Sequence, residues 1–336
     1  MKALVTGGGG FIGAHVVRQL RARGDQVRVF CRGDYPELAA HGVELVRGDL
    51  ADGNAVAAAC AGVDCVFHVA AKAGVWGDYA GYHAPNVEGT RHVVDGCRRH
   101  DVPRLVFTSS PSVVFDNRAH RGEDETLPYP EHYENPYSQT KAEAERLVLG
   151  ASDGRLRATA LRPHLVFGPG DPHLLPRVVA KGRRRQLVQV GDGENRVDLT
   201  YVEDAARAHL LAADALERNG SAAGRAYFIT QGEPVNLWNW VRELLAALDL
   251  PGPTRRVSAG TAHRIGAFLE CTHRLLHLPG EPRLTRFVAS ELALDHYYDI
   301  SAAERDLGYR PERTMAQALE LTLPDLRARF ISGTGT

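Results

Sequence analysis

The chain has 336 residues, 44% of them hydrophobic, and its formal net charge is −1. This length is enough for one large domain or two modest ones with a buried core. Because the charge is almost balanced, no global electric field attracts nucleic acid, and we expect no nucleic-acid partner.

The five cysteines are odd in number and include no Cys-x-x-Cys pair, which favours a reducing compartment. The amino-terminal stretch lacks the charged and apolar segments of a secretory signal. No window approaches the roughly 18 apolar residues of a membrane span. We therefore expect a cytoplasmic protein. The 15 histidines are scattered without the spacing of metal ligands, so we expect no metal.

Short runs rich in β-branched residues alternate with helical patterns in the first half of the chain. We expect strands at 3–7, 26–31, 43–49, 64–70, 104–110 and 157–163, and helices at 11–24, 52–60, 86–99 and 136–150. This alternation predicts an α/β fold, a Rossmann-type doubly wound parallel sheet with helices on both faces.

The rhythm changes after about residue 164, where Pro and Gly cluster. A strand and helix at 197–214 and a strand at 225–230 are expected to return to the first domain. The rest is mostly helical and predicts a smaller C-terminal substrate domain. We thus predict a cofactor-binding domain at 1–163 together with 197–230, a substrate domain at 164–196 and 231–331, and a disordered tail at 332–336.

A glycine-rich segment, TGGGGFIG (6–13), joins the first expected strand to the first expected helix. Gly7, Gly10 and Gly13 form Gly-x-x-Gly-x-x-Gly, and Gly8 with the last two forms the tighter Gly-x-Gly-x-x-Gly. A turn of positive φ, the close approach of a pyrophosphate and the positive end of a helix dipole all require this arrangement. Its position between strand and helix predicts a dinucleotide site rather than a simple tight turn.

The residue after the second strand distinguishes the two nicotinamide dinucleotides. A carboxylate there would mark NAD, but the chain has Cys31 followed by Arg32. Because the guanidinium fork suits a 2′-phosphate, we predict NADP(H); the alternative is that Arg32 is a solvated loop cation. Asp49 is expected at the adenine, with Leu50 packed beside it.

The fourth strand ends in HVAAKAG (68–74), at the carboxyl edge of the sheet where the cofactor must lie. Ala70 and Ala71 are expected to contact it. Lys72 is either a cation of the site or a plain surface lysine.

Tyr137 and Lys141 lie four residues apart at the start of the helix expected at 136–150. Reduction of a ketone leaves an alkoxide that must be protonated, and a tyrosine with a pKa of about 10 does this poorly at neutral pH. A lysine one helical turn away favours the tyrosinate and lowers that pKa. The pair predicts an acid/base site, although the same spacing also occurs on solvated helix surfaces.

Hydroxyl side chains follow the fifth strand in TSSPS (108–112). A serine at this position can donate a hydrogen bond to the substrate carbonyl oxygen and stabilise the developing charge. The alternative is that these serines only satisfy the backbone of a turn.

These motifs together resemble the extended short-chain dehydrogenase/reductases, also called the NAD-dependent epimerase/dehydratase superfamily. The glycine motif, Asn86 in NVEGT, Ser110, the pair Tyr137 and Lys141, and Pro163 all fall where that family has them, and the resemblance covers most of the chain.

The resemblance implies a role for each matching residue. Tyr137 is the general acid/base, and Lys141 binds the nicotinamide ribose and tunes Tyr137. Ser110 orients the carbonyl, with Ser109 as the second choice, and Asn86 holds a water in a proton relay. The residues expected to contact the cofactor are Gly7, Gly10, Phe11, Ile12, Gly13, Arg32, Asp49, Leu50, Ala70, Ala71, Tyr137, Lys141, Pro163 and Val166.

Within that family the chain is most similar to the 3β-hydroxysteroid dehydrogenase-like branch and, inside it, to the bacterial 2-alkyl-3-oxoalkanoate reductases of long-chain olefin biosynthesis. The stretches that carry this similarity include 32–43, 70–83, 108–115, 264–270, 280–287 and 294–301. The implied reaction is NADPH-dependent reduction of a lipid-like 3-oxo acid. A sterol-type or dihydroflavonol-type dehydrogenase is the alternative inside the branch.

Two features bear on an apolar substrate. Trp76, Tyr79 and Tyr82 are expected in a loop that either covers the ligand or packs as ordinary aromatics. The helix expected at 262–278 carries an apolar stripe, at Ile265, Phe268, Leu269, Leu275 and Leu276, that favours core packing. The alternative is an interfacial helix that makes the protein membrane-peripheral or docks a pathway enzyme. A carboxylate on the substrate would need a cation, and His164, Arg177 and Lys72 are the candidates.

Two rival functions have different signatures. A nucleotide-sugar epimerase or dehydratase shares the fold, but such dehydratases usually carry Asp-Glu after the catalytic hydroxyl, where this chain has Pro111-Ser112. A module that only senses NADP(H) would typically have lost Tyr137 or Lys141. The resemblance also implies a homodimer by analogy.

Overall fold

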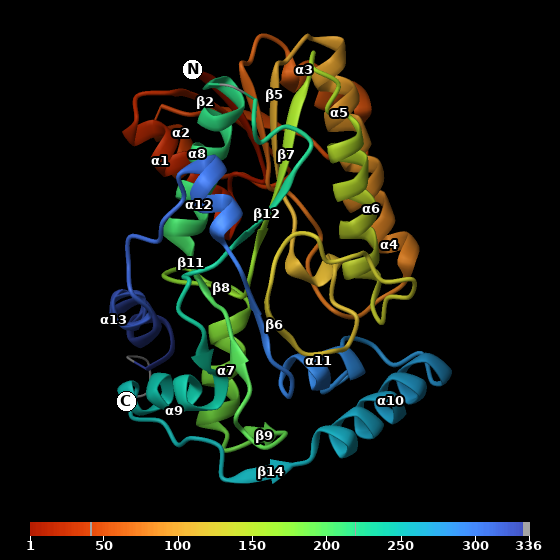
Figure 1. Cartoon of the computed structure of the whole chain (residues 1–336), viewed down its shortest axis with the longest axis vertical. Coiled ribbons are helices and arrows are strands. Elements are labelled where there is room, and N and C mark those ends of the chain that lie inside the picture. Colours follow the sequence, from red (N-terminus) through yellow and green to blue (C-terminus); the bar gives the residue numbers. More distant parts are fainter. Residues whose placement is uncertain (41, 219, 332–336) are drawn as a thin grey trace.

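Seven parallel strands form the central sheet of the protein (Figure 1). The computed structural model describes residues 1–40, 42–218 and 220–331, so the tail predicted at 332–336 lies outside it. The strand order is β12-β7-β5-β4-β1-β2-β3. The strands are β1 (Lys2–Thr6), β2 (Gln26–Cys31), β3 (Glu44–Arg47), β4 (Cys65–His68), β5 (Arg104–Thr108), β7 (Arg157–Pro163) and β12 (Ala226–Ile229). The predicted fold class is confirmed.

Helices cover both faces of this sheet, as Figure 1 shows. One face carries α1 (Phe11–Ala22), α2 (Pro36–Ala40), α8 (Val202–Arg218) and α12 (Ser301–Leu307), and the other carries α3 (Gly53–Cys60), α5 (Gly89–Arg99) and α6 (Pro136–Gly150). Successive strand residues serve opposite cores: Ala3 and Val5 pack with the first group of helices and Leu4 with the second. This is the pattern of a strand buried on both sides.

A third core lies below the sheet in Figure 1 and includes Phe167, Leu175, Trp238, Trp240 and Leu244. Its helices are α7 (Leu174–Arg183), α9 (Leu237–Ala247), α10 (Ala259–Leu275), α11 (Arg286–Glu291) and α13 (Met315–Leu326), followed by the π-helix η3 (Arg327–Ile331). The remaining short strands are β6 (His120–Glu123), β8 (Val166–Phe167), β9 (Val188–Val190), β10 (Arg196–Val197), β11 (Thr200–Tyr201), β13 (Val235–Asn236), β14 (Arg255–Val257) and β15 (His296–Tyr298).

The predicted domain boundaries are crossed in two places. Strand β6, inside the range 1–163, pairs with β15 in a separate four-stranded sheet of order β13-β10-β15-β6. Helix α12, inside the range 231–331, contributes Ala303 and Leu307 to a core of the main sheet. The division into two domains therefore stays a prediction.

We predicted a loop for the segment 75–83, but part of it is helical. Residues Tyr79–His83 form helix α4, because Asp78 caps it by accepting a hydrogen bond from the Gly81 N–H at 2.7 Å. The π-helix η1 (Ala84–Glu88) joins α4 to α5, so the helix predicted at 86–99 begins earlier. Tyr82 is buried in this segment and Tyr79 is exposed.

The apolar stripe predicted to pack in the core on α10 is mostly exposed instead. Phe268 and Leu275 are 69% and 72% exposed, and Ile265 and Leu276 are also exposed. The buried positions of α10 are Ala262, Gly266 and Glu270, because a Cβ at Gly266 would lie 2.7 Å from the Thr285 carbonyl carbon and Glu270 accepts two hydrogen bonds from Arg286. Small residues and one ion pair therefore form the packed face.

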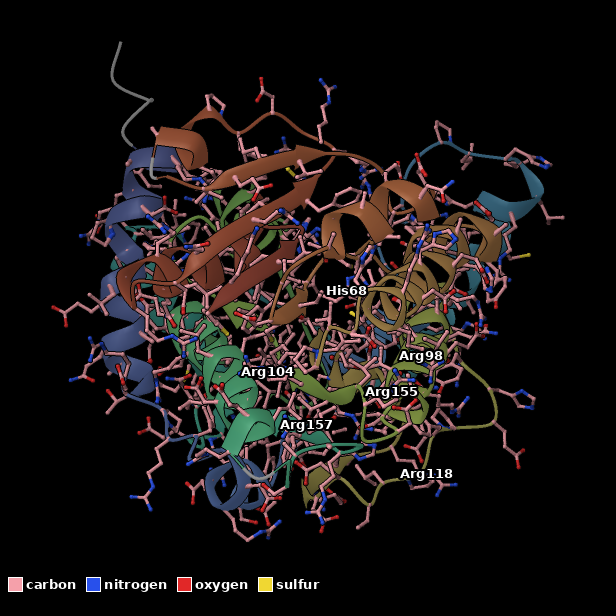
Figure 2. All side chains as sticks on the ribbon, turned by 90° about the horizontal axis from the view of Figure 1, so that it is seen from above. His68, Arg98, Arg104, Arg118, Arg155 and Arg157 are labelled. Atoms are coloured by element: carbon pink, nitrogen blue, oxygen red, sulfur yellow. The ribbon has the colours of Figure 1, made fainter. Side chains whose placement is uncertain are left out.

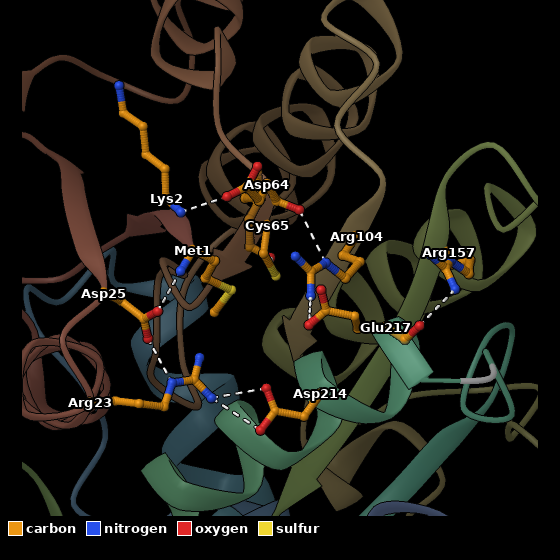
Figure 3. Close-up of polar contacts among 11 residues, drawn as sticks. Met1, Lys2, Arg23, Asp25, Asp64, Cys65, Arg104, Arg157, Asp214 and Glu217 are labelled. Atoms are coloured by element: carbon orange, nitrogen blue, oxygen red, sulfur yellow. Dashed lines mark hydrogen bonds and ion pairs between the residues drawn. The ribbon is translucent and has the colours of Figure 1, made fainter.

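Ion pairs tie the amino ends of the strands to α8 (Figure 3). The Met1 ammonium lies 2.7 Å from Asp25 Oδ1, and Arg23 bridges Asp25 and Asp214. Arg104 on β5 lies 2.7 Å from Glu217. This edge is opposite the carboxyl ends of the strands, so its charges support the scaffold.

Candidate active site

A cavity of about 1020 Å³ runs along the carboxyl ends of the sheet strands. In doubly wound sheets this edge is where ligands bind. Nearly every predicted site residue lines it: Gly7, Gly10, Phe11, Ile12, Gly13, Arg32, Asp49, Leu50, Ala70, Ala71, Ser110, Tyr137, Lys141, Pro163 and Val166. Asn86 is not part of the lining.

The glycine loop leaves room that no side chain could share. Gly7 has a φ of +71°, and a Cβ at Gly13 would lie 2.2 Å from the Gly7 carbonyl oxygen. Helix α1 begins at Phe11 without a side-chain cap on Gly10, so its first N–H groups are free to meet an anion. The loop thus fits a dinucleotide pyrophosphate.

The far end of the cavity carries an exposed cation, Arg32. The Arg32 side chain is 81% exposed and its Nη1 lies 4.0 Å from Asp49 Oδ2, a weak contact between exposed groups. Arg47 Nε donates to the Arg32 carbonyl oxygen at 3.2 Å, which fixes the backbone while the guanidinium stays accessible. The guanidinium is therefore able to reach an added phosphate.

Helix α6 places Tyr137 and Lys141 on one face. Asn135 caps this helix by accepting from the Ser138 N–H at 2.8 Å, and Pro136 occupies the first turn, where no N–H is needed. Lys141 Nζ donates to the Thr108 carbonyl oxygen at 2.5 Å. Burial lowers the pKa of Lys141 to about 7, and the charge of Glu145 opposes this shift.

The pKa of Tyr137 moves opposite to the expected direction. Desolvation raises it, a side-chain hydrogen bond with Ser110 lowers it in part, and Tyr82 adds to the rise. The expectation that Lys141 would lower this pKa is wrong for this structure, because the ammonium binds the Thr108 carbonyl and burial weakens its charge. A protonated Tyr137 at neutral pH is the form that donates a proton.

Of the candidate serines, Ser110 is the one that meets Tyr137. It caps the short 3-10 helix η2 (Pro111–Val113) by accepting from the Ser112 N–H at 3.2 Å. Ser109 also lines the cavity, but its Oγ is buried without a hydrogen-bond partner among the described residues. Ser110 therefore does both things: it satisfies the backbone of the turn and it forms a hydrogen bond with Tyr137.

Asn86 lies behind the cavity wall and fixes a backbone segment. Its Oδ1 accepts from the Lys72 N–H at 2.7 Å, and its Nδ2 donates to the Lys72 carbonyl oxygen at 3.2 Å and to Thr140 Oγ1 at 3.1 Å. It stands in the π-helix η1, and such helices often mark functional sites. Its role in a proton relay stays a prediction.

Two buried polar groups were missed in the sequence. His68 bonds Thr6 Oγ1 at 2.7 Å and Thr90 Oγ1 at 2.9 Å, and burial lowers its pKa to about 3, so the ring is neutral. Figure 2 marks it near the centre of the view and Arg118 nearer its edge.

Glu145, one turn beyond Lys141, lies 2.6 Å from Arg162. Glu145 could have been found from the sequence, because it continues the four-residue spacing of Tyr137 and Lys141.

The three candidate cations for a substrate carboxylate are placed very differently. His164 is buried and its Nε2 lies 2.6 Å from His296 Nδ1. Arg177 is exposed and pairs with Glu281 at 3.0 Å. Lys72 lines the cavity and has no ion-pair partner within 4.0 Å among residues 1–40, 42–218 and 220–331.

His164, His296 and Glu291 form the one cluster with metal-ligand atoms close together in the described chain. Two nitrogen ligands of a tetrahedral zinc, at bonds of about 2.0 Å, would be roughly 3.3 Å apart. The 2.6 Å between the histidine nitrogens is instead the length of a hydrogen bond, and His296 Nε2 is 2.7 Å from the Glu291 carbonyl oxygen. The cluster is a chain of hydrogen bonds.

Comparison with known proteins places this site in a family. The sequence model of the 3-beta hydroxysteroid dehydrogenase/isomerase family matches residues 4–258. A 2-alkyl-3-oxoalkanoate reductase of Stenotrophomonas maltophilia is 50% identical over 324 residues, which are 95% of this chain and 97% of that protein. A 3 beta-hydroxysteroid dehydrogenase/Delta 5→4-isomerase of Mycobacterium tuberculosis is 37% identical over 335 residues, 96% of this chain and 90% of that protein.

Solved structures share the fold. MoeE5 in complex with UDP-glucose and NAD superposes with a TM-score of 0.74 at 26% identity, covering 98% of this chain and 99% of that one. The family match spans most of the chain, and the Stenotrophomonas relative agrees with it along nearly its whole length. The chain therefore belongs to the 3-beta hydroxysteroid dehydrogenase/isomerase family, with the fold of the short-chain dehydrogenase/reductases.

Proposed function

We propose that the protein is an NADPH-dependent reductase that converts a 2-alkyl-3-oxoalkanoate to the 2-alkyl-3-hydroxyalkanoate. The observation that carries this proposal is the convergence of Ser110, Tyr137 and Lys141 in the cavity that begins at the glycine loop. The relative that is 50% identical bears the name of such a reductase, which supports the substrate class.

The side chains divide the work of ketone reduction. A bound NADPH supplies the hydride. Ser110 donates a hydrogen bond to the carbonyl oxygen as its negative charge develops. Tyr137, whose pKa is raised by desolvation, gives that oxygen its proton. Lys141, four residues on, faces the same side of α6, where it would bind the nicotinamide ribose of that cofactor.

The preference for NADP(H) rests on Arg32. Its guanidinium is exposed at the end of β2, where an acidic residue would bind the ribose of NAD. Replacing Arg32 by Asp is expected to weaken NADPH binding at least tenfold and NADH binding much less, since a charge-assisted hydrogen bond contributes roughly 1.5–3 kcal/mol. Equal losses for both cofactors, measured by fluorescence titration, would contradict the assignment.

Turnover of defined substrates tests the function. Purified protein is mixed with NADPH or NADH and with a long-chain 2-alkyl-3-oxo acid, a 3-oxo steroid or UDP-glucose, and products are quantified. We expect NADPH-dependent loss of the oxo acid. The steroid arm matters because a steroid dehydrogenase is 37% identical. Conversion of UDP-glucose without added cofactor would support the epimerase alternative, since MoeE5 binds that compound.

We also propose a cytoplasmic location at the membrane surface. No helix in the part of the chain that the structure describes is long and apolar enough to span a bilayer. The exposed side of α10 combines Phe268, Leu275 and Leu276 with Arg264 and Arg274. This mixture of apolar and basic side chains is suited to an anionic lipid surface, which attracts the arginines while the apolar groups insert.

A further inference from the structure

We infer that Lys72 binds the carboxylate of the substrate and so makes the reductase selective for 3-oxo acids over neutral ketones. The inference rests on the proposed function, since it assigns a specificity residue to that reaction. It commits to one of three cations that the sequence left open.

The first argument is position. Lys72 follows β4 at the carboxyl edge of the sheet and lines the cavity shared with Tyr137. Its Nζ lies 4.5 Å from the centroid of the Tyr82 ring, and that ring meets the Tyr137 ring edge-on with centroids 6.5 Å apart. The ammonium is therefore on the tyrosine side of the cavity. In a 3-oxo acid the carboxyl carbon is two bonds from the reacting carbon, so its cation must lie near the tyrosine.

The second argument is availability. Lys72 is exposed to the cavity and has no ion-pair partner within 4.0 Å in the described ranges, so its charge is open to a ligand. The hydrogen bond from the Gly81 N–H is the main cause that lowers the pKa of the Asp78 carboxyl, and the nearby charge of Lys72 lowers it further. Asp78 and Lys72 nevertheless form no ion pair within 4.0 Å. Stacking over Tyr82 holds the ammonium without neutralising it.

The third argument is that the other candidate cations have different work. Lys141 Nζ is buried against the Thr108 carbonyl oxygen and the Phe107 ring. Arg32 lies at the β2 end. His164 shares a hydrogen bond with His296 and is not part of the lining, and Arg177 is paired with Glu281.

The fourth argument is that the backbone of Lys72 is fixed. Asn86 accepts from its N–H and donates to its carbonyl oxygen, so one side chain holds both polar groups of the residue. Asn86 also bonds Thr140, next to Lys141, which couples the position of Lys72 to helix α6. A residue held this firmly can present its side chain in a defined direction. Asn86 is on this account a positioning residue.

Two substrates and two variants test the inference. The wild type, Lys72→Met and the matched control Arg177→Met are assayed with NADPH on a long-chain 2-alkyl-3-oxo acid and on its methyl ester. The affinity of each protein for NADPH is measured separately. For Lys72→Met we expect kcat/KM for the acid to fall on the order of 30-fold, mostly through KM, as for one lost charge-assisted contact. We expect the ester and the NADPH affinity to change less than about twofold, and Arg177→Met to match the wild type.

Other outcomes separate the possible failures. Equal losses on acid and ester with weakened NADPH binding would show that Lys72 holds the cofactor and would overturn the inference. An unchanged acid preference in Lys72→Met would overturn it as well. In both cases the reductase assignment survives. A wild type that reduces neither compound contradicts the proposed function, and the inference falls with it.

Discussion

At the scale of single residues, the site is governed by burial. Tyr137 and Lys141 face the same cavity, but desolvation pushes the pKa of the tyrosine up and that of the lysine down to about 7. Both shifts favour the uncharged forms. The tyrosine is thus held as a proton donor, which suits the reductive direction.

The lowered pKa of the buried Lys141 leads to a prediction of how the free energy of unfolding depends on pH. The pKa of Lys141 is about 7 when folded, against its ordinary value of 10.5, so the unfolded chain binds the extra proton between these values. The contribution of Lys141 to the free energy of unfolding is therefore most favourable above about pH 10.5, and it becomes less favourable as the pH falls toward 7. Urea unfolding at pH 7, 8 and 9 should show the wild type gaining free energy of unfolding relative to Lys141→Met. A difference that does not vary with pH would contradict the shift.

Residue patterns also show what a sequence can and cannot give. The glycine loop and the Tyr137–Lys141 spacing are local, so strand and helix context was enough to place them. The bond from Asn86 to Lys72 and the ion pair between Glu145 and Arg162 join segments 14 and 17 residues apart through the fold. No local pattern shows such partners, although the i, i+4 continuation to Glu145 was available.

At the scale of elements, α6 is anchored to the sheet by a buried ion pair. Glu145 and Arg162 side chains are 0% and 3% exposed, and Tyr129 adds a hydrogen bond to Glu145 at 2.7 Å. The pair connects the helix that carries Tyr137 and Lys141 to β7, whose last residue, Pro163, lines the cavity. Its charges are therefore part of the support of the active site.

Removing one partner should be costly. Arg162→Met leaves a buried carboxylate without its cation, and we expect the free energy of unfolding to fall by about 3 kcal/mol. The matched control is Arg155→Met, which breaks an ion pair with Asp101 between side chains that are 88% and 78% exposed. That control should cost less than about 0.5 kcal/mol. Urea denaturation gives both values, and similar losses in the two variants would refute the structural role of the buried pair.

Helix α10 shows where an element-level prediction failed. The stripe from Ile265 to Leu276 has helical spacing, but spacing alone does not say which face has a partner. The packed face is instead set by Gly266, which lets the helix approach Thr285, and by Glu270, which binds Arg286. A small residue and a charged one gave no apolar signal, so the packed face could not be recognised from hydrophobicity.

At the scale of the whole molecule, the cavity lies between the central sheet and the segment that follows β7. The sheet carries the cofactor side through its glycine loop, and Leu165, Pro172 and His173 close the cavity from the following segment. Figure 1 shows α10 at the far end of the molecule from the amino ends of the strands. Its Arg274 stands 5.3 Å from the Trp76 ring, in the segment that follows Lys72. A membrane at α10 would therefore lie near the Lys72 side of the site.

Vesicle binding tests this arrangement. The double variant Phe268→Glu with Leu275→Glu should lose at least fivefold in co-sedimentation with vesicles rich in phosphatidylglycerol, because two apolar groups are lost and two like charges are added. Leu321→Glu, an exposed leucine on α13, is the matched control and should behave as the wild type. Wild-type protein that ignores anionic vesicles would contradict the membrane proposal. A dimer that dissociates in the double variant would instead indicate that a second copy covers this face.

The most direct test of the central claim is to follow the hydride. NADPH carrying deuterium in place of both hydrogens at nicotinamide carbon 4 is mixed with the 2-alkyl-3-oxo acid, and the product is examined by mass spectrometry for the wild type and Tyr137→Phe. We predict a 3-hydroxy acid with one deuterium at carbon 3, formed at least 100-fold more slowly by the variant, because proton donation typically contributes 10²–10⁴-fold. A hydroxy product without deuterium, or a variant as fast as the wild type, would contradict it.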